Sequence, residues 1–559
     1  MTNVTRRGAL FAGISLVGAS ATACADRQSV DFPVHFNHGV ASGDPGANRI
    51  VIWTRISAKI PNALPVPSIP IKWEMATDKA FRKIRRKGKV TTDASRDYTV
   101  KVDATGLKPG QTYYYRFKVG EYISPVGRTK TLPAGAVETA RFAVVSCSHF
   151  GFGYFNVYDE IAKHDHFDAV LHLGDYFYEY GRDGYGSQVG AKLGRLVEPA
   201  HEVLSLADYR TRHAQYKSDS ASQAVHAAHP FICIWDDHET ANDSWKTGAE
   251  NHNEGDGNWD ARRASAMQAY YEYMPVRDPE PGRAREALFR SYSFGDLLTL
   301  CAIETRLTAR TRPLDYAQYI ADLQTRAGIG NFVQNVLGDP SRELLGAAQS
   351  AYVGKALQTS KSADQPWRLI ANQVVMARIA SPDLTIYKDA EFLKDIEKLF
   401  PQIHDYIALS PLGLPLNLDA WDGYPAAREK FYTTAQEQGV TDLLVLTGDT
   451  HECWANKLET ASGTAMGVEL GTTSVTSPGT GAYFGEASAD FSARLNAKND
   501  DVIYHNLESH GYIDLSLNRE SGQANFVSVD TIYKTDYKAF TSKSFKIEKQ
   551  DGSLILQDS

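Results

Sequence analysis

Four apolar, strand-like segments of this 559-residue chain each end in side chains that bind metals or transfer protons. One Asp after a strand says little, because Asp is common in turns. The carboxyl ends of strands in open α/β sheets, however, meet at one crevice, so four such ends predict one shared site. The four segments end in Ser146-Cys147-Ser148-His149, Gly174-Asp175-Tyr176-Phe177-Tyr178, Trp235-Asp236-Asp237-His238-Glu239 and Thr447-Gly448-Asp449-Thr450-His451.

The chemistry that suits this set is hydrolysis of a phosphate ester at a pair of cations. Asp175 could bridge two cations about 3.5–4 Å apart, which polarise phosphoryl oxygens and lower the pKa of a bound water. Bound cations also reverse the local field of acidic side chains, which would otherwise repel the phosphate. His238, next to Asp237, is the candidate general acid that protonates the leaving alkoxide. The sequence therefore predicts a two-metal hydrolase with His238 as its catalytic residue.

The elements that would position these residues alternate between strands and helices from about Ala134 onwards. Such alternation indicates an α/β, or layered α+β, core in which helices flank β-sheet layers. We assign this core to residues 138–535 and treat 536–559 as a C-terminal segment whose relation to the site stays open. Strands are predicted at 141–146, 168–173, 231–235, 298–303, 367–375, 443–446 and 465–470, and helices at 155–164 and 426–438.

Residues 34–133 have an all-β pattern. Short apolar runs at 50–55, 71–74, 98–102 and 113–119 are bounded by Gly, Pro and Asp, as strands are. The segment from Leu107 to Tyr113 resembles the tyrosine corner of fibronectin-III-like sandwiches. The sequence therefore predicts an N-terminal β-sandwich that carries no chemistry of its own.

The first 25 residues are predicted to be an export signal. Arg6 and Arg7 precede a weakly apolar stretch, and Ala21-Thr22-Ala23 provides a cleavage site. We expect export by the twin-arginine translocation machinery to a periplasmic or secreted location. The alternative is a lipid anchor on Cys24.

The amino-acid composition of the chain bears on which classes of function are compatible with it. Hydrophobic residues make up 43% of the chain and charged residues 23%, which is ordinary for a globular protein. Lys and Arg number 59 against 67 Asp and Glu, a net charge of −8. A nucleic-acid binder normally has a basic excess, so nucleic-acid binding is not predicted.

Taken together, these segments resemble the alkaline phosphatase D (PhoD-like) family of calcineurin-like metallophosphoesterases. The resemblance covers nearly the whole chain after the signal and implies a metallophosphoesterase fold with phosphomonoesterase and phosphodiesterase activity. It also implies a centre of one ferric ion and calcium, other divalent metals being the alternative. The segments that carry it are 39–45, 174–180, 209–212, 235–239, 372–373 and 448–451.

Residue by residue, the resemblance implies two ligand sets joined by Asp175. The implied iron ligands are Cys147, Asp175, Tyr178 and His451, and the implied calcium ligands are Asp175, Asp237 and Asp449. Carboxylate oxygens suit calcium better than an imidazole-rich zinc site would.

Several neighbouring residues have open alternatives. Asp236 is a candidate partner of His238. Asn372 is either near the second metal or a hydrogen-bonded amide at a strand end. Cys147 is either a thiolate ligand or the partner of Cys453 in a disulfide. No role is assigned to Arg306 in Glu304-Thr305-Arg306. Arg210 and Arg212 could reach a phosphate, but the favoured prediction is that they are solvated helix-face charges.

Three functions remain compatible with these residues. The leading one is an exported alkaline phosphatase/phosphodiesterase acting on phosphate-ester small molecules, or on phospholipid or teichoic-type phosphodiesters. The second is a phospholipase-D-like phosphodiesterase on the same scaffold. The third is a non-catalytic calcium-binding envelope protein, which would not explain a Tyr and a His placed beside the carboxylates. The sequence is silent on oligomeric state and pH optimum.

Overall fold

A computed structural model describes residues 33–58, 68–397 and 402–559. The predicted export signal and Cys24 lie outside the described residues. Over the described ranges, the structure contains no helix that combines the length and the apolar character of a membrane span.

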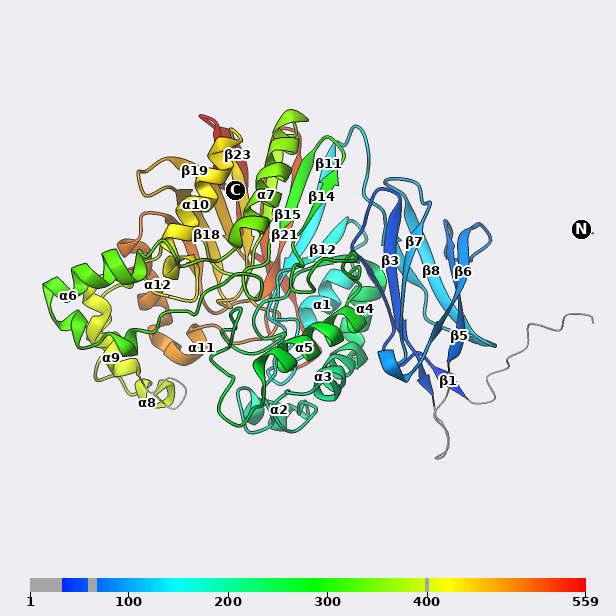
Figure 1. Ribbon diagram of the computed structural model, residues 1–559, viewed down its shortest axis with the longest axis horizontal. Helices are drawn as coiled ribbons and strands as arrows, with labels where there is room; N and C mark the ends of the chain where they lie inside the picture. Colours follow the sequence, from blue (N-terminus) through cyan, green and yellow to red (C-terminus); the bar gives the residue numbers. More distant parts are fainter. Residues whose placement is uncertain (1–32, 59–67, 398–401) are drawn as a thin grey trace, which may run out of the picture.

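Two large β-sheets pack face to face in the middle of the molecule (Figure 1). Their facing sides share one apolar core, which contains Phe142 and Leu171 of the first sheet and Leu300 and Leu369 of the second. The first sheet has the order β24-β23-β22-β21-β11-β12-β13-β2-β3-β7, and the second has the order β14-β15-β16-β17-β19-β18-β20.

The strands of the first sheet are β2 (Val40–Gly43), β3 (Arg49–Arg55), β7 (Thr99–Thr105), β11 (Thr139–Val145), β12 (Ala169–His172), β13 (Pro230–Cys233), β21 (His510–Asn518), β22 (Gly522–Val529), β23 (Ala539–Gln550) and β24 (Ser553–Asp558). The strands of the second sheet are β14 (Arg290–Phe294), β15 (Leu298–Ala302), β16 (Trp367–Ala371), β17 (Leu443–Thr447), β18 (Cys453–Glu459), β19 (Ala465–Gly471) and β20 (Val502–Asn506).

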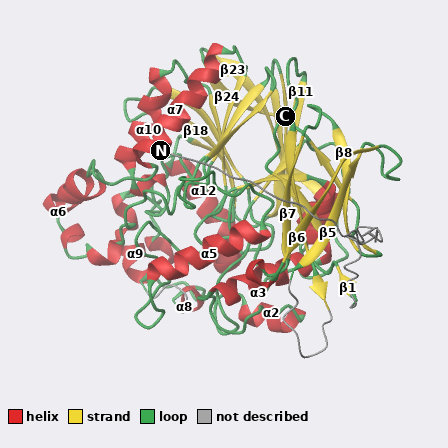
Figure 2. Cartoon of the chain, turned by 45° about the vertical axis from the view of Figure 1, so that its right-hand side comes forward, coloured by secondary structure: helices red, strands yellow, loops and turns green. Residues whose placement is uncertain are grey.

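Helices cover the outer faces of both sheets, which confirms the predicted layered α/β fold (Figure 2). Side-chain caps mark where several of these helices begin. Ser205 forms a capping box with Asp208 at the start of the helix that begins at Leu206, and Asn258 caps the helix that begins at Trp259. The first sheet is covered by α1 (Asn156–Ala162), α3 (Leu206–Ser218), α4 (Ser220–Ala228) and α5 (Trp259–Tyr273), and the second by α7 (Gly346–Ser362), α10 (Pro425–Glu437) and α12 (Ser488–Lys498). The remaining helices are α2 (Ser187–Leu193), α6 (Arg326–Asn331), α8 (Leu393–Ile396), α9 (Ile403–Leu409) and α11 (Gly481–Phe484).

Each sheet contains four neighbouring parallel strands, which are β11, β12, β13 and β2 in the first and β15, β16, β17 and β19 in the second. Their carboxyl ends lie at the same edge of the molecule. In the first sheet β11 pairs with β12 and β12 with β13; in the second, β15 pairs with β16 and β16 with β17. A parallel bridge between Ser146 and Ser474 joins the two sheets at this edge. The loops after these strands therefore converge on one place, as the sequence predicted.

The N-terminal strands form the predicted all-β region. A further sheet has the order β10-β8-β5-β6, with β9 beside β8, and its core includes Tyr115 and Phe117. The Tyr113 hydroxyl accepts a hydrogen bond from the Lys108 N–H at 2.9 Å, which confirms the tyrosine corner. The strands not yet given are β1 (Val34–His35), β4 (Ser57–Ala58), β5 (Ile69–Ala76), β6 (Ile84–Thr92), β8 (Thr112–Val119), β9 (Tyr122–Ile123) and β10 (Gly127–Lys130).

Two connections were not foreseen from the sequence. Strand β2 pairs in parallel with β13, with Ser42 opposite Pro230, so β2, β3 and β7 continue the first sheet. The C-terminal segment forms β23 and β24 at the other edge of that sheet, where the Ser553 hydroxyl donates to the Thr441 carbonyl just before β17. That contact lies at the end of β17 opposite Asp449, so β24 does not cover the crevice.

Candidate metal centre

The first candidate group gathers a thiol, a carboxylate, a phenol and an imidazole around one point. The Cys147 thiol donates to Asp175 Oδ2 over 3.4 Å, and the Tyr178 hydroxyl donates to the same oxygen over 3.1 Å. The same hydroxyl lies 2.9 Å from His451 Nε2. The structure thus brings together all four residues for which the family resemblance implied iron ligation.

The His451 ring is oriented so that the lone pair of its Nε2 faces this group. Its Nδ1 lies 2.9 Å from the Pro478 carbonyl oxygen, which can only accept, so Nδ1 carries the proton. Burial lowers the pKa of His451 to about 4, which keeps the ring neutral at physiological pH. A neutral imidazole with a fixed tautomer is the form that binds a metal.

Four candidate ligands have backbone conformations that residues other than glycine rarely adopt. The φ angles are 60° for Cys147, 53° for Asp175, 68° for Asp449 and 62° for His451, all in the left-handed region. Each such residue costs roughly 1–3 kcal/mol and persists where the surrounding structure enforces it, often at functional sites. The sharp turns after β11, β12 and β17 therefore aim these side chains inward instead of along the strand.

A second candidate group consists of carboxylates around a buried arginine. Asp236, Asp237 and Asp449 have oxygens within 4.8 Å of one another. Arg306 is fully buried; its Nε donates to Asp236, and its Nη2 lies 3.2 Å from Asp449 Oδ1 and 3.8 Å from Asp237 Oδ1. Its Nη1 donates to Asp419 Oδ2 over 2.6 Å.

The donor set fits cations, because its carboxylates carry more negative charge than the protein itself neutralises. Burial, reinforced by Asp237 and Asp236, raises the pKa of Asp175, and burial together with Asp236 raises the pKa of Asp449. Asp175 Oδ1 and Asp236 Oδ2 are buried and have no hydrogen-bond partner among the described residues. Buried carboxylates are normally hydrogen-bonded, paired or coordinated to a metal. Donor atoms lie within 4.8 Å in three sets: Cys147, Asp175 and His451; Asp175, Asp237 and His238; and Asp236, Asp237 and Asp449.

His238 lies beside these groups and is positioned by Glu179. Its Nδ1 is 2.7 Å from Glu179 Oε2, and its ring packs against Tyr178 with centroids 4.1 Å apart. Burial opposes the charged ring, but Asp237 and Glu179 outweigh it and raise the pKa of His238 well above its usual value. In its protonated form, His238 can act as a general acid.

Glu179 is a supporting residue that the sequence did not single out. Its Oε1 accepts hydrogen bonds from the Asn242 N–H at 2.7 Å and from Asn251 Nδ2 at 2.9 Å. The feature of the sequence that could have identified Glu179 is its position in the segment 174–180, four residues after Asp175.

The structure corrects the interpretation of two candidate residues. Asp236 contacts Arg306 and not His238, whose partner is Glu179. Both polar atoms of the Asn372 amide form hydrogen bonds within the protein. Its Nδ2 donates to the Val374 carbonyl at 2.6 Å, and its Oδ1 accepts from the Trp421 indole at 3.4 Å. The strand-end alternative therefore holds for Asn372.

The two arginines expected to be solvated are also engaged. Arg212 is fully buried and donates to the carbonyls of Tyr178 and Tyr180, which holds the loop that carries Asp175 and Tyr178. Arg210 forms an ion pair with Glu272 at 2.7 Å. Helix α3 therefore contributes to the candidate centre by holding, through Arg212, the loop that carries two of its residues.

The proposed alternative of a Cys147–Cys453 disulfide is not what the structure contains. Both residues are free, buried cysteines. Cys453, the first residue of β18, belongs to the apolar core between the sheets, whereas Cys147 faces Asp175.

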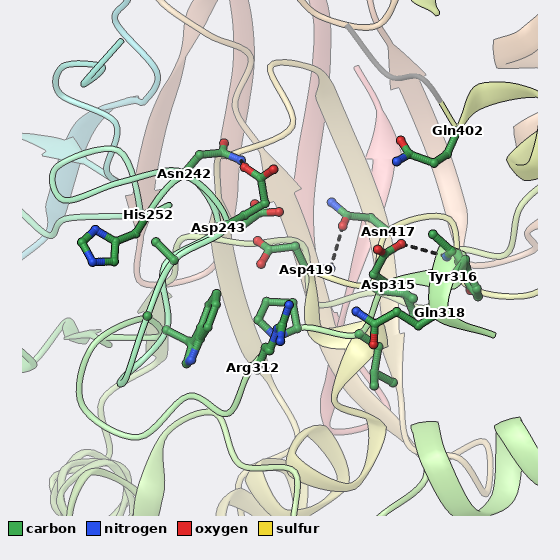
Figure 3. Close-up of a pocket in the computed structure, with 18 of the residues that line it drawn as sticks. Asn242, Asp243, His252, Arg312, Asp315, Tyr316, Gln318, Gln402, Asn417 and Asp419 are labelled. Carbon is green, nitrogen blue, oxygen red and sulfur yellow. Dashed lines mark hydrogen bonds between the residues drawn. The ribbon is translucent and has the colours of Figure 1, made fainter. Parts of the chain in front are cut away.

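A cavity of about 1170 Å³ lies next to the second group (Figure 3). Asp419, which contacts Arg306, and Asp243, whose N–H donates to Asp237 Oδ2 at 2.6 Å, line its wall. The wall also includes Trp245, against which the Arg312 guanidinium stacks at 5.5 Å. A substituent on a molecule bound at the carboxylates could extend into this space.

Replacing Arg306 by methionine is expected to lower the free energy of unfolding of the metal-free protein by about 3–5 kcal/mol. The variant leaves Asp236 and Asp419 buried without their counter-charge, and breaking a buried pair costs about that much. Denaturant unfolding of chelator-treated protein measures it. The control Arg494→Met, which removes a solvent-exposed pair with Asp490, should cost far less, because exposed ion pairs contribute little to stability. Equal losses in the two variants would contradict this role for Arg306.

Three comparisons with known proteins agree with this geometry. Residues 142–526 match a family described as PhoD-like phosphatase, and residues 21–133 match its N-terminal domain. The chain is 34% identical over 528 residues to alkaline phosphatase D of Bacillus subtilis (strain 168), covering 93% of this chain and 82% of that protein. It also aligns with the solved structure of PhoD at 31% identity and a TM-score of 0.76, covering 94% of this chain and 92% of that one.

Proposed function

Since the chain belongs to the PhoD-like phosphatase family and is therefore a phosphoric ester hydrolase, we propose that it cleaves phosphate mono- and diesters at a mixed iron–calcium centre. The observation that carries the proposal is the convergence of Cys147, Asp175, Tyr178 and His451 beside the carboxylates of Asp237 and Asp449.

The proposed distribution of metals follows from the donor atoms. A ferric ion would be held by Cys147, Asp175, Tyr178 and His451, and calcium by the harder oxygen set of Asp175, Asp237 and Asp449. When bound, such cations polarise the phosphoryl oxygens and lower the pKa of a water. Asp175 belongs to both sets, because its Oδ2 faces Cys147 and Tyr178 while its Oδ1 has no partner among the described residues.

The chain's own residues supply the proton and the orientation. Glu179 holds the His238 ring through Nδ1, which leaves Nε2 as the proton donor. As a water oxygen forms the new bond to phosphorus and the P–O bond to the leaving alcohol breaks, the proton on Nε2 passes to the oxygen of that alcohol, which departs neutral. Burial of the centre excludes bulk water and so strengthens the electrostatic contacts made there.

The cavity beside Asp243 and Asp419 favours diesters among the possible substrates. A space of about 1170 Å³ is far larger than a phosphate group needs, and it would take the second alcohol of a diester. The phospholipase-D-like alternative shares this feature, so a panel of phosphatidylcholine, bis-aryl phosphate and aryl phosphate is needed to separate the two.

We expect the Tyr178→Phe variant to lose a visible absorption band that the wild-type protein shows. A tyrosinate bound to ferric iron absorbs visible light, and the Tyr178 oxygen lies within 3.1 Å of both Asp175 and His451. The matched control is Tyr176→Phe, because the Tyr176 hydroxyl contacts Ser222 and His226 instead. A colourless wild-type protein without iron, yet fully active, would remove iron from the proposal.

The Glu179→Gln variant is expected to lower kcat by about 10–100-fold while leaving the metal content unchanged. The amide still reaches His238 but no longer carries the charge that favours its protonated form. The fall should be larger for alkyl than for aryl leaving groups, since alkoxides depend more on the donated proton. The control Glu202→Gln changes a carboxylate that pairs with Arg262. A uniform fall over all leaving groups would argue against a role through His238.

The direct test of the proposed activity is hydrolysis of a chromogenic aryl phosphodiester with and without a chelator. We expect activity that the chelator abolishes and that iron plus calcium restores. Absence of turnover by the metal-loaded protein would favour the calcium-binding envelope protein instead.

Export by the twin-arginine route remains part of the proposal. It rests on Arg6, Arg7 and the small residues before Cys24. Appearance of the protein in the periplasm or medium, and its loss from there in an Arg6→Lys, Arg7→Lys variant, tests it.

A further inference from the structure

The hairpin formed by β5 and β6, residues 69–92, carries a dense positive charge that the catalytic centre does not use. In a chain of net charge −8, these residues include eight cations and two carboxylates. We refer to this segment as the basic hairpin. Its cations are Lys72, Lys79, Arg82, Lys83, Arg85, Arg86, Lys87 and Lys89.

The basic hairpin is exposed and lies far from the centre. Strand β6 is the last strand of the sheet β10-β8-β5-β6, so one of its sides has no neighbouring strand in that sheet. All eight cations are exposed. Figure 1 shows β5 and β6 at the outer side of the N-terminal region, across the molecule from α6 and α9. None of the eight residues lines the cavity beside the centre.

The two carboxylates of the hairpin are already engaged. Glu74 accepts from Arg116 at 2.8 Å and lies 2.8 Å from Lys118, two cations that come from the neighbouring strand β8. Asp78 accepts the backbone N–H groups of Arg82 at 3.0 Å and Lys83 at 2.6 Å, which closes the turn. Asp78 also pairs with the Arg82 side chain, whose Nε lies 3.8 Å from its Oδ2. Two carboxylates are nevertheless too few to neutralise eight cations.

The strand register places like charges opposite one another. Lys72 on β5 lies between Lys118 on β8 and Lys89 on β6 in directly paired positions. Like charges in directly opposite positions of a sheet repel one another. Glu74 lies 2.8 Å from Lys118 and offsets the charge of that residue, and a bound polyanion would offset the repulsion between Lys72 and Lys89.

Protection of an exposed edge is the competing explanation. Lysines on an edge strand prevent pairing with other chains, and charges of either sign serve that purpose. Edge protection does not require a single sign across eight residues. It also does not account for Lys72 on β5, which has β8 on one side and β6 on the other.

We propose that the basic hairpin binds a linear anionic polymer with phosphodiester groups along its length. Side chains two residues apart on one strand, such as Lys87 and Lys89, are separated by roughly 6.6–6.8 Å, a repeat that suits successive charges of an extended polymer. A row of cations along a single strand fits a line of charges better than a lipid surface. The N-terminal region would then hold a polymer on a site separate from the one that hydrolyses phosphate esters.

The test measures binding of a fluorescent 15-mer of thymidylate, used as a model phosphodiester chain, to the metal-loaded protein by anisotropy. The matched probe is its methylphosphonate analogue, which is neutral at every linkage. We expect binding of the charged probe only. With about four phosphate contacts, affinity should fall about 50-fold between 50 and 200 mM salt, because each contact contributes about −0.7 to the logarithmic salt slope. Probe integrity is checked by gel at the end of each titration.

The deciding variant is Arg82→Glu, Lys83→Glu, Lys87→Glu, which keeps charged residues on the hairpin but leaves it five cations and five carboxylates, a net charge of zero. The matched control reverses three exposed lysines elsewhere, Lys192, Lys355 and Lys534. We expect the first variant to lose binding at least tenfold and the control to keep it, with aryl phosphate hydrolysis unchanged in both. Equal binding by the two variants would overturn the proposal, and so would tighter binding to vesicles of 30% phosphatidylglycerol in phosphatidylcholine than to the oligomer. Because binding is read without turnover, its failure is distinct from failure of the proposed hydrolase activity.

Discussion

Replacing Asp175 by asparagine is expected to remove both metals and to reduce phosphodiester hydrolysis by about a thousandfold or more. The Asp175 carboxylate belongs both to the donor set with Cys147 and His451 and to the donor set with Asp237 and His238. The charge of its buried Oδ1, which has no hydrogen-bond partner among the described residues, is lost in the amide. Lewis-acid stabilisation of the transferring phosphoryl group supplies several kcal/mol, and about 4 kcal/mol corresponds to a thousandfold in rate. Metal content by mass spectrometry and kcat measured on the same sample test the expectation.

The control for this variant lies at the opposite end of β12 from Asp175. Asp168 precedes β12 at its other end, where it pairs with Lys130 and accepts the Arg141 N–H at 2.9 Å. Asp168→Asn should therefore keep its metals and its activity. An Asp175→Asn protein that retains two tightly bound cations would show that this carboxylate does not join the two groups.

Replacing His238 by alanine should leave the metals bound and slow the hydrolysis of alkyl diesters by about 10²–10⁴-fold, the usual contribution of a general acid. The Nε2 proton is the one given to the leaving alkoxide, and alanine cannot supply it. Aryl esters should lose less, because their phenolate leaving groups depart without protonation. A plot of log kcat against leaving-group pKa measures the difference as a steeper slope.

The matched control for His238 is His149→Ala. This imidazole also packs against Tyr178, with centroids 4.7 Å apart, but its Nδ1 accepts the N–H of Gly151. Its removal should leave the slope of the plot unchanged. Unaltered turnover of an alkyl diester by His238→Ala would end the assignment of His238 as the acid.

The core strands could be predicted because they are buried on both faces. Parallel strands between two layers have nearly continuous apolar sequences, and β11, β12, β13 and β17 all do. Their ends were equally visible, since Asp175, Asp237 and Asp449 follow apolar runs directly. The candidate ligands were therefore found from local sequence and from the resemblance together, and the structure brings them into one place.

The supporting residues could not be predicted, because their roles depend on partners far away in the chain. Arg306 contacts carboxylates from Asp236 to Asp449, and nothing in its own neighbourhood distinguishes a buried arginine from a solvated one. Arg212 presents the same problem on α3. Glu179 is close to Asp175 in sequence, but its contact with His238 spans 59 residues.

The strands that were not predicted from the sequence lack the usual apolar signal. Strand β6 has few buried side chains and is rich in Lys and Arg, so no alternation of apolar and polar residues is visible. Strand β2 is only four residues long and ends in Gly43. A Cβ at Gly43 would lie 2.6 Å from the carbonyl oxygens of Phe231 and Pro275, so glycine permits the close approach of β2 to β13.

The candidate centre is assembled from residues of both sheets. The first sheet supplies Cys147, Asp175 and His238, and the second supplies Asp449 and His451. Neither sheet alone holds a complete ligand set. The apolar core between the sheets therefore determines the geometry of the centre as well as the stability of the fold.

The most direct measurement is anomalous X-ray diffraction from crystals of the purified protein, recorded above and below the iron absorption edge. We predict an iron peak within bonding distance of Cys147 Sγ, Tyr178 Oη and His451 Nε2, and a second, iron-free cation between Asp175 and Asp449. An active protein whose metals lie elsewhere, or whose crystals show no cation among these side chains, would contradict the account.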